Sequence, residues 1–315
     1  MNMKRSLCIL LLFNCVLAGA QQIVLDNGVI RREISIHDGH LSGQKYRINS
    51  SSADFMRPAS REFSFLVDGV LYSGESSWRA FRHSDIQSKD GGKGIVVSFD
   101  DVKRRFRVTL TYLAYPGLPI VRKFLSVENI GKADLCLEAV NVEDFAMTLS
   151  PIESWVMRQY ARYKWLGPYE GNWDDPLIIV QDNKKGAGIA IGNEAVGVLK
   201  RSSVFLDGKS LTAGMTTPAQ DFPFRRWLKK GEKWESPGCF TALYEGAGNP
   251  YEIAQTVVQD FVRRHMGVRI ERIPRKPMFV YNTWNPFRRN IDEKLIRELA
   301  EAAAECGVEE FVIDD

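Results

Sequence analysis

Apolar and polar residues alternate along much of the chain from Gln21 to about Arg269. Residues 105–112 read RFRVTLTY, with an apolar side chain at every second position. Because successive side chains of a β-strand point to opposite faces, this period places one face on a core and the other in water. Short runs rich in Val, Ile, Phe, Tyr and Thr are therefore predicted as strands at 63–67, 94–99, 106–112, 120–127, 135–145, 177–180 and 188–191.

Turn signals separate these predicted strands. Asn27-Gly28, Asp68-Gly69 and Asp207-Gly208 are Asn/Asp-Gly pairs, the strongest short-range hairpin signal. Many short strands with turns every 8–12 residues or so are typical of a β-sandwich or a β-barrel. The sequence therefore predicts one large, mainly β domain over residues 21–270.

The hydrophobic period changes near residue 249. Ile253, Val257, Phe261 and Val262 have helical spacing within 250–266, which predicts an amphipathic helix. The chain then becomes basic and contains prolines up to Pro277, which is typical of an inter-domain linker and places it at 271–277.

The last segment predicts a strand, a helix and a second strand. Residues 278–283 are strand-like, and Asn290 to Glu293 have the pattern of a capping box with Asn290 as the N-cap. Gly307 suits a left-handed helix end, and 310–313 form a short apolar run. The helix stripe consists of Leu295, Ile296, Leu299, Ala302, Ala303 and Cys306.

This βαβ order implies parallel strands with a right-handed crossover. One such unit cannot bury both faces of its sheet, so we expect further chain to complete the fold.

Polar residues follow both of these strands. Residues 282–285 (NTWN) follow the first, and Asp314 and Asp315 follow the second. Ligand sites of parallel sheets lie at the carboxyl ends of their strands. Paired carboxylates can bind sugar hydroxyls or a cation, and a tryptophan suits the apolar face of a sugar ring. Spacing alone leaves open the alternative of strand-end caps beside a packed Trp284.

The amino terminus has the pattern of an export signal, predicted over residues 1–20. Lys4 and Arg5 precede an apolar run at 7–17, and Ala18-Gly19-Ala20 is a small-residue cleavage site. The run is shorter than the roughly 20 residues that span a bilayer. We therefore expect a secreted or periplasmic protein beginning near Gln21; the alternatives are a buried N-terminal element or, less favoured, a lipid anchor at Cys15.

Composition narrows the class of protein. With 44% hydrophobic and 26% charged residues over 315 positions, the chain is neither disordered nor collagen-like. The net charge of +3 falls to +1 without Lys4 and Arg5, which disfavours nucleic-acid and membrane-surface partners. No other apolar run is long enough to span a membrane.

Cysteines and histidines indicate no metal site, and we expect no metal and no cofactor. Cys136, Cys239 and Cys306 are odd in number and widely spaced, so we predict three buried thiols. His37 and His40 lie in a predicted turn and not on a helix, so their spacing does not indicate a metal site. The run 91–94 (GGKG) reads as a hairpin turn, because it lacks the phosphate-loop spacing.

Three tryptophans have two interpretations. Trp155, Trp165 and Trp173 could line a carbohydrate-binding face, although core packing and loop anchoring are the usual roles of such residues.

Residues 279–315 closely resemble the start of the catalytic barrel of family 36 glycoside hydrolases, the α-galactosidases or melibiases. The similarity rests on the NTW strand end at 282–284 and on the GVxxFVxDD pattern at 307–315. Upstream, 115–123 (YPGLPIVRK), 127–131 (VENIG), 228–232 (LKKGE) and 262–265 (VRRH) are similar to the N-terminal domain of that family.

This resemblance implies a large N-terminal β-sandwich over 21–270, followed at 278–315 by the incomplete start of a (β/α)8 TIM barrel. It implies a retaining glycosidase acting on terminal α-galactosyl groups, with Trp284 lining the galactose pocket and Asp314 and Asp315 holding sugar hydroxyls. The family's nucleophile and acid/base lie on later barrel strands. We therefore expect this chain to be a fragment without catalytic residues, inactive by itself. The family usually has an acidic residue after this tryptophan, whereas this chain has Asn285-Pro286.

Two other functions remain open at this stage. The sandwich could act as a carbohydrate-binding or assembly module without catalysis, or the family resemblance could extend to a galactosyltransferase or another α-glycosidase. The expected partner is an α-galactoside substrate, and a homo-oligomer is left open.

Overall fold

The computed structural model describes residues 21–150, 152–157, 162–166, 169–171, 175–204, 210–246, 249–267 and 277–314. The predicted export signal, most of the predicted linker, the Asp207-Gly208 turn and Trp173 lie outside these residues. Two compact units divide between Met266 and Gly267, and each is described by itself.

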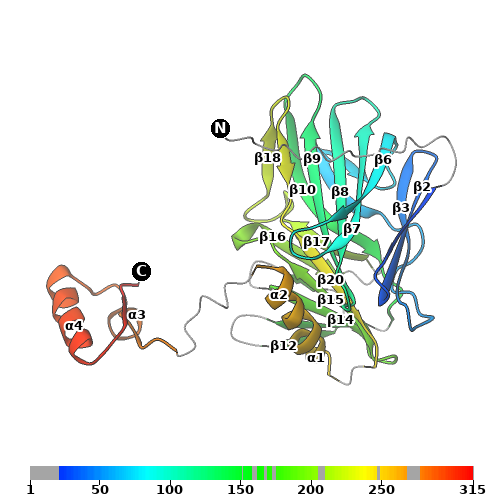
Figure 1. Cartoon of the computed structure of the whole chain (residues 1–315). Helices are drawn as coiled ribbons and strands as arrows, with labels where there is room; N and C mark the ends of the chain where they lie inside the picture. Colours follow the sequence, from blue (N-terminus) through cyan, green and yellow to red (C-terminus); the bar gives the residue numbers. More distant parts are fainter. Residues whose placement is uncertain are drawn as a thin grey trace, which may run out of the picture. The chain divides into compact units, whose positions relative to one another are not determined.

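The first unit consists mainly of antiparallel sheets, which confirms the predicted β-sandwich (Figure 1). A three-stranded sheet begins the chain and pairs its strands in sequence order. Its strands are β1 (Gln21–Asp26), β2 (Ile30–His37) and β3 (His40–Ile48).

A seven-stranded sheet has the order β13-β16-β17-β10-β4-β5, with β18 also paired to β10. Its long strand β10 therefore pairs with three others. The strands are β4 (Glu62–Val67), β5 (Val70–Ser73), β10 (Leu135–Ala146), β13 (Tyr169–Gly171), β16 (Lys200–Val204), β17 (Ser210–Met215) and β18 (Arg225–Leu228), and a 3-10 turn at Gly197–Leu199 precedes β16.

A ten-stranded sheet has the order β12-β11-β14-β15-β20-β9-β8-β7-β6, with β19 also paired to β9. Its strands are β6 (Trp78–Gln87), β7 (Lys93–Asp101), β8 (Phe106–Ala114), β9 (Ile120–Asn129), β11 (Ile152–Met157), β12 (Arg162–Leu166), β14 (Leu177–Asp182), β15 (Ala187–Asn193), β19 (Lys233–Glu235) and β20 (Cys239–Tyr244).

One continuous core joins the three sheets. Its fully buried members include Ile34 on β2, Phe63 on β4 and Val108 on β8. Along most of β8, buried residues alternate with half-buried ones. The alternation read from the sequence thus marks the inner faces. The predicted turn at Asp68-Gly69 is also confirmed: these residues have φ of 52° and 77°, which suits the two-residue hairpin between β4 and β5.

The predicted helix near residue 250 is confirmed and is continuous. It comprises α1 (Tyr251–Ile253), a π-helical turn (Ala254–Val258) and α2 (Gln259–His265). Phe261 is fully buried, with its ring centroid 5.0 Å from that of Phe240 on β20. The helix therefore covers part of the ten-stranded sheet with a second apolar cluster (Figure 1).

The second unit is a strand–helix–strand unit, as the sequence predicts. β21 (Val280–Asn282) and β22 (Glu310–Val312) pair in parallel, and α3 (Trp284–Phe287) and α4 (Glu293–Glu305) lie between them in sequence. The short helix α3 is additional to the prediction. The complete barrel that the resemblance implies stays a prediction.

The ends of α4 correct one prediction and confirm another. The N-cap is Asp292, whose Oδ1 accepts the Leu295 amide at 2.8 Å, and it is not Asn290. The Asn290 amide instead donates to the Phe287 carbonyl, so this residue belongs to the turn that closes α3. Gly307 has φ of 79°, and Val308 N donates to Ala303 O at 3.0 Å, as in a Schellman motif.

The cysteine prediction is correct for two of the three thiols. Cys136 and Cys239 are buried, whereas Cys306 is exposed. Cys306 is the C-cap of α4. Of the residues within α4, only Ala303 is buried. Within the described residues, no helix is long and apolar enough to cross a membrane.

Candidate functional site

The ends of β21 and β22 bring the predicted polar residues together. We call Asn282, Thr283, Trp284 and Asp314 the strand-end site. Asn282 pairs with Val312 in the parallel register, so the residues that follow each strand emerge at the same edge. Asn282 Nδ2 donates to Asp314 Oδ2 at 2.9 Å, which joins the two strand ends directly.

Thr283 and Asn282 fix the backbone of this site. Thr283 is fully buried, and its Oγ1 accepts the Asp314 amide at 3.1 Å. Asn282 Oδ1 accepts the Trp284 amide at 2.7 Å, an Asx turn that starts α3. These contacts hold Trp284 and Asp314, both half-buried, near one edge of the sheet.

The structure describes two of the three predicted sugar-binding residues. Asp314 and Trp284 are both tethered to Asn282, whereas Asp315 lies outside the described residues. Their role in binding sugar stays a prediction. Thr283 belongs to the predicted polar run 282–285, but the sequence assigned it no role of its own.

In the described part of the chain, no three His, Cys, Asp or Glu side chains are grouped so that they could hold a metal ion. His37 and His40 flank the turn between β2 and β3, where Asp38 and Gly39 have φ of 48° and 77°. The His40 ring bonds to the Glu75 carbonyl through Nδ1 at 2.8 Å.

A cluster of four charged side chains lies in the core of the sandwich. Arg32, Glu62, Lys123 and Glu143, here called the buried charge cluster, are all fully buried. Arg32 bonds to Glu143 and to Glu62, each at 2.8 Å. Lys123 Nζ lies 3.1 Å from Glu62 and 3.2 Å from Glu143. These residues come from β2, β4, β9 and β10, so the cluster links all three sheets.

The cations of this cluster act on the Glu62 carboxyl. Burial opposes ionisation of Glu62, but Arg32 and Lys123 outweigh it and lower the pKa of this carboxyl to about 2. Tyr112 also donates to Glu62 Oε2 at 2.8 Å. Because none of the four side chains reaches solvent, the cluster is a structural element of the sandwich and no substrate site.

The sequence contained a signal for this cluster. Arg32 occupies an inward position of β2, between the buried Ile30 and Ile34. A cation at such a position needs buried carboxylate partners.

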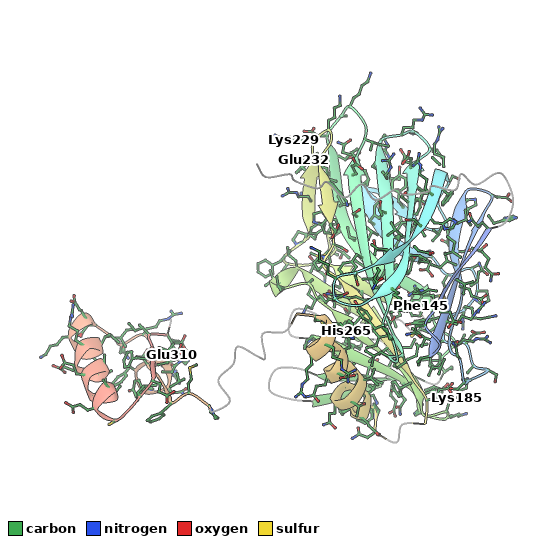
Figure 2. All side chains as sticks on the ribbon, in the orientation of Figure 1. Phe145, Lys185, Lys229, Glu232, His265 and Glu310 are labelled. Carbon is green, nitrogen blue, oxygen red and sulfur yellow. The ribbon has the colours of Figure 1, made fainter. Side chains whose placement is uncertain are left out.

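A second polar network anchors the helix α2 to the sheet. Arg122 Nε donates to Glu194 at 2.7 Å and its Nη1 donates to Asp90 at 2.9 Å. Tyr115 also donates to Asp90, and the Asp90 carbonyl bonds to His265 Nδ1 at 2.6 Å. Figure 2 shows His265 at the end of this helix. The 115–123 motif is therefore explained by packing.

Trp155 is also a packing residue, since its ring meets Tyr251 edge-on at 5.4 Å. Of the other two tryptophans proposed for a carbohydrate-binding face, Trp173 and the side chain of Trp165 lie outside the described residues.

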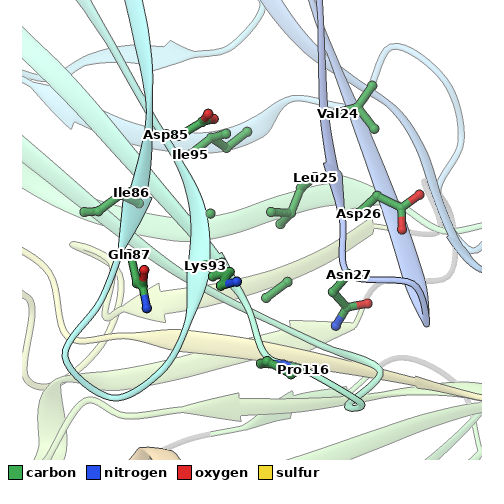
Figure 3. A pocket seen from close by; sticks show the side chains of 12 residues that line it. Val24, Leu25, Asp26, Asn27, Asp85, Ile86, Gln87, Lys93, Ile95 and Pro116 are labelled. Atoms are coloured by element: carbon green, nitrogen blue, oxygen red, sulfur yellow. The ribbon is translucent and has the colours of Figure 1, made fainter. Parts of the chain in front are cut away.

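A groove of about 770 Å³ separates two sheet edges of the sandwich (Figure 3). Val24 to Asn27 of the first hairpin form one wall, and Asp85 to Gln87 on β6 form the other. None of its twelve lining residues is aromatic, so it offers no stacking surface for a sugar ring.

Comparisons with known proteins show which solved structures share this fold. No protein-family model matches the chain, and no curated protein matches its sequence. Solved structures do match: the α-galactosidase from Lactobacillus brevis has a TM-score of 0.68 at 13% identity, over 93% of this chain and 48% of that one. The family 36 α-galactosidase AgaB from Geobacillus stearothermophilus has a TM-score of 0.65 at 15% identity, over 93% and 49%.

The galactosidase domain of the α-galactosidase–sucrose kinase AgaSK has a TM-score of 0.67 at 12% identity, over 94% of this chain and 51% of that one. The chain thus spans about half the length of the structures it matches. At identities this low, the structural matches show a shared fold only. As a similarity of fold, they confirm the resemblance seen in the sequence. The chain therefore shares its fold with about half the length of each of these solved α-galactosidases, which include an enzyme of glycoside hydrolase family 36.

Proposed function

We propose that this chain is the N-terminal part of a retaining, α-galactosidase-like glycoside hydrolase that releases terminal α-galactosyl residues from oligo- or polysaccharides. The fold shared with α-galactosidases over 93% of the chain carries the proposal. The strand-end site supports the proposal as a possible ligand site, because Asn282, Trp284 and Asp314 lie together at the carboxyl ends of two parallel strands. Variants of AgaA from Geobacillus stearothermophilus have been solved with raffinose and with stachyose.

In this proposal the strand-end residues bind the sugar. The indole of Trp284 covers the apolar face of the galactose ring, and Asp314 with Asp315 accepts hydrogen bonds from its hydroxyls. A retaining glycosidase needs two further carboxyl groups about 5–5.5 Å apart, one nucleophile and one acid/base. We assign both to barrel strands that follow Asp315 in the complete enzyme. Residues 1–20 would export it to the periplasm or the medium.

The test is hydrolysis of 4-nitrophenyl α-galactoside by the protein encoded together with the in-frame sequence after codon 315. Trp284→Ala and Asp314→Asn are expected to lower kcat/KM about 10–100-fold, the effect of losing a hydrogen bond to a charged group or a ring contact. Trp227→Ala is the matched control, since Trp227 is 60% exposed on β18.

Three results would contradict the proposal. They are a stop codon without barrel sequence downstream, no turnover of any α-galactoside, and unchanged kcat/KM in both strand-end variants. The 315-residue chain alone is expected to show no turnover, and activity there would refute our assignment of the catalytic carboxylates.

A further inference from the structure

Four hairpin turns are tied together at one end of the sandwich. They are 68–69 between β4 and β5, 102–105 between β7 and β8, 130–134 between β9 and β10, and 229–232 between β18 and β19. Arg105 pairs with Asp68 at 3.3 Å, and its carbonyl accepts the Gly131 amide at 2.8 Å. The Gly231 amide donates to the Asn129 carbonyl at 2.8 Å. The four turns therefore form one surface, which we call the basic end.

Five exposed cations stand out in the basic end, and Figure 2 shows one of them, Lys229, at its tip. None of their side chains has an ion pair within the described residues; they are Lys103, Arg104, Lys132, Lys229 and Lys230. Asp68 shares Arg105 with the buried Asp101. Among the remaining charged side chains of the turns, the five cations face only two carboxylates, Asp134 and Glu232. The small net charge of the whole chain hides this local excess of positive charge.

Apolar side chains project among these cations. Val102 in the second turn is 48% exposed, and Val70, directly after the first turn, is 54% exposed. Trp227 is 60% exposed and lies two residues before Lys229. An acidic polysaccharide would attract the cations but would gain nothing from the aliphatic groups, whereas a lipid surface uses both. The combination therefore favours an anionic lipid surface as the partner.

We propose that the basic end binds the surface of a bilayer that contains anionic lipids. The cations contact the lipid phosphates, and Val70 and Val102 enter the boundary between headgroups and acyl chains. The inference does not depend on the proposed galactosidase activity, because it concerns only turns of the first unit.

The experiment is co-sedimentation with vesicles of equimolar phosphatidylglycerol and phosphatidylcholine, compared with vesicles of phosphatidylcholine alone. The chain used begins at Gln21, the expected mature form, because the apolar run at 7–17 could bind lipid by itself. Binding is expected only to the vesicles that contain phosphatidylglycerol. It should weaken as salt is added, because salt screens the attraction between exposed charges.

Two matched lysine pairs test the location. Lys229→Gln combined with Lys230→Gln is expected to weaken binding about 25-fold, which corresponds to about 1 kcal/mol for each cation at an anionic surface. Lys184→Gln combined with Lys185→Gln removes two exposed lysines from the turn between β14 and β15, and binding should stay unchanged. Figure 2 shows Lys185 far from Lys229. Val102→Ser is expected to weaken binding about fivefold, because the aliphatic contact is lost. Circular dichroism checks that each variant is folded.

Other outcomes overturn the inference. No binding to phosphatidylglycerol vesicles, or an equal loss in the two lysine pairs, excludes the basic end as a lipid-binding surface. Equal binding to phosphatidylcholine alone would show adsorption through apolar surface without the cations. Unchanged vesicle binding in Val102→Ser, with binding of polygalacturonate that depends on Lys229 and Lys230, would identify an acidic polysaccharide as the partner and refute the inference.

Discussion

Replacing Lys123 by methionine tests whether the buried charge cluster stabilises the sandwich. Methionine has a similar length, so the change removes charge with little change in volume. Lys123 Nζ lies 3.1 Å from Glu62 and 3.2 Å from Glu143, and the variant leaves Arg32 to balance two carboxylates alone. One uncompensated negative charge then remains in the core.

The magnitude follows from these distances. At an effective dielectric constant of about 20, unit charges about 3.2 Å apart attract by about 5 kcal/mol. The variant loses two such attractions but also avoids the desolvation of the ammonium, which costs several kcal/mol. We therefore expect Lys123→Met to lower the free energy of unfolding by about 3–5 kcal/mol, the range for breaking one partner of a buried ion pair.

Urea unfolding followed by tryptophan fluorescence measures this change. Adding Glu143→Gln to Lys123→Met restores charge balance around Arg32, so the double variant should lose at least about 1 kcal/mol less than the sum of the single variants. Lys229→Met, an exposed lysine at the tip seen in Figure 2, should stay within about 0.5 kcal/mol of the parent chain. A loss below about 1 kcal/mol for Lys123→Met, or strict additivity in the double variant, would refute the reasoning.

Two further predictions concern the same region. Because the pKa of Glu62 falls from an ordinary value of 4.5 to about 2 on folding, its contribution to stability is complete above about pH 4.5 and is lost as pH falls towards 2. Thermal unfolding between pH 7 and pH 2 should show this loss, and an equally steep loss in Glu62→Gln would contradict it. A Cβ on Gly43 would lie 2.2 Å from Glu62 Oε1 and 2.5 Å from Met56 Sδ, so Gly43→Ala should lower stability by about 1–3 kcal/mol in urea unfolding. Gly28→Ala, with nothing within 4 Å of the new Cβ, should show only the strain of its φ of 85°, and an equal loss in both would argue against the clash.

The sequence predicted those features that depend on local pattern. Alternation along β8 and the Asp68-Gly69 pair report the local backbone, and the structure confirms them. The start of α4 shows the limit of such reasoning. Asn290 and Asp292 are both good N-caps, and the choice between them depends on the turn that Asn290 closes with Phe287.

The buried charge cluster could not be predicted from local sequence pattern, for a related reason. Arg32 bonds to Glu143 across 111 residues of sequence, and no periodicity links positions so far apart. Sequence could place the cation on the inner face, but only the packing of three sheets shows which carboxylates meet it. The strand-end site was easier to predict, because the parallel register brings the ends of both strands to one edge.

Arg122 and Lys123 show what the two parts of the family resemblance mean. They are adjacent on β9, so their side chains point to opposite faces of the sheet. Arg122 joins the network that anchors α2, whereas Lys123 enters the buried charge cluster between the sheets. The resemblance at 115–123 therefore concerns how a sandwich is held together, and many functions could use such a scaffold. The resemblance at Asn282, Trp284 and Asp314 concerns residues that follow two parallel strands at one edge of their sheet, where ligand sites of such sheets lie. The proposed specificity for galactosides therefore depends on the second unit, and variants there are its most direct test.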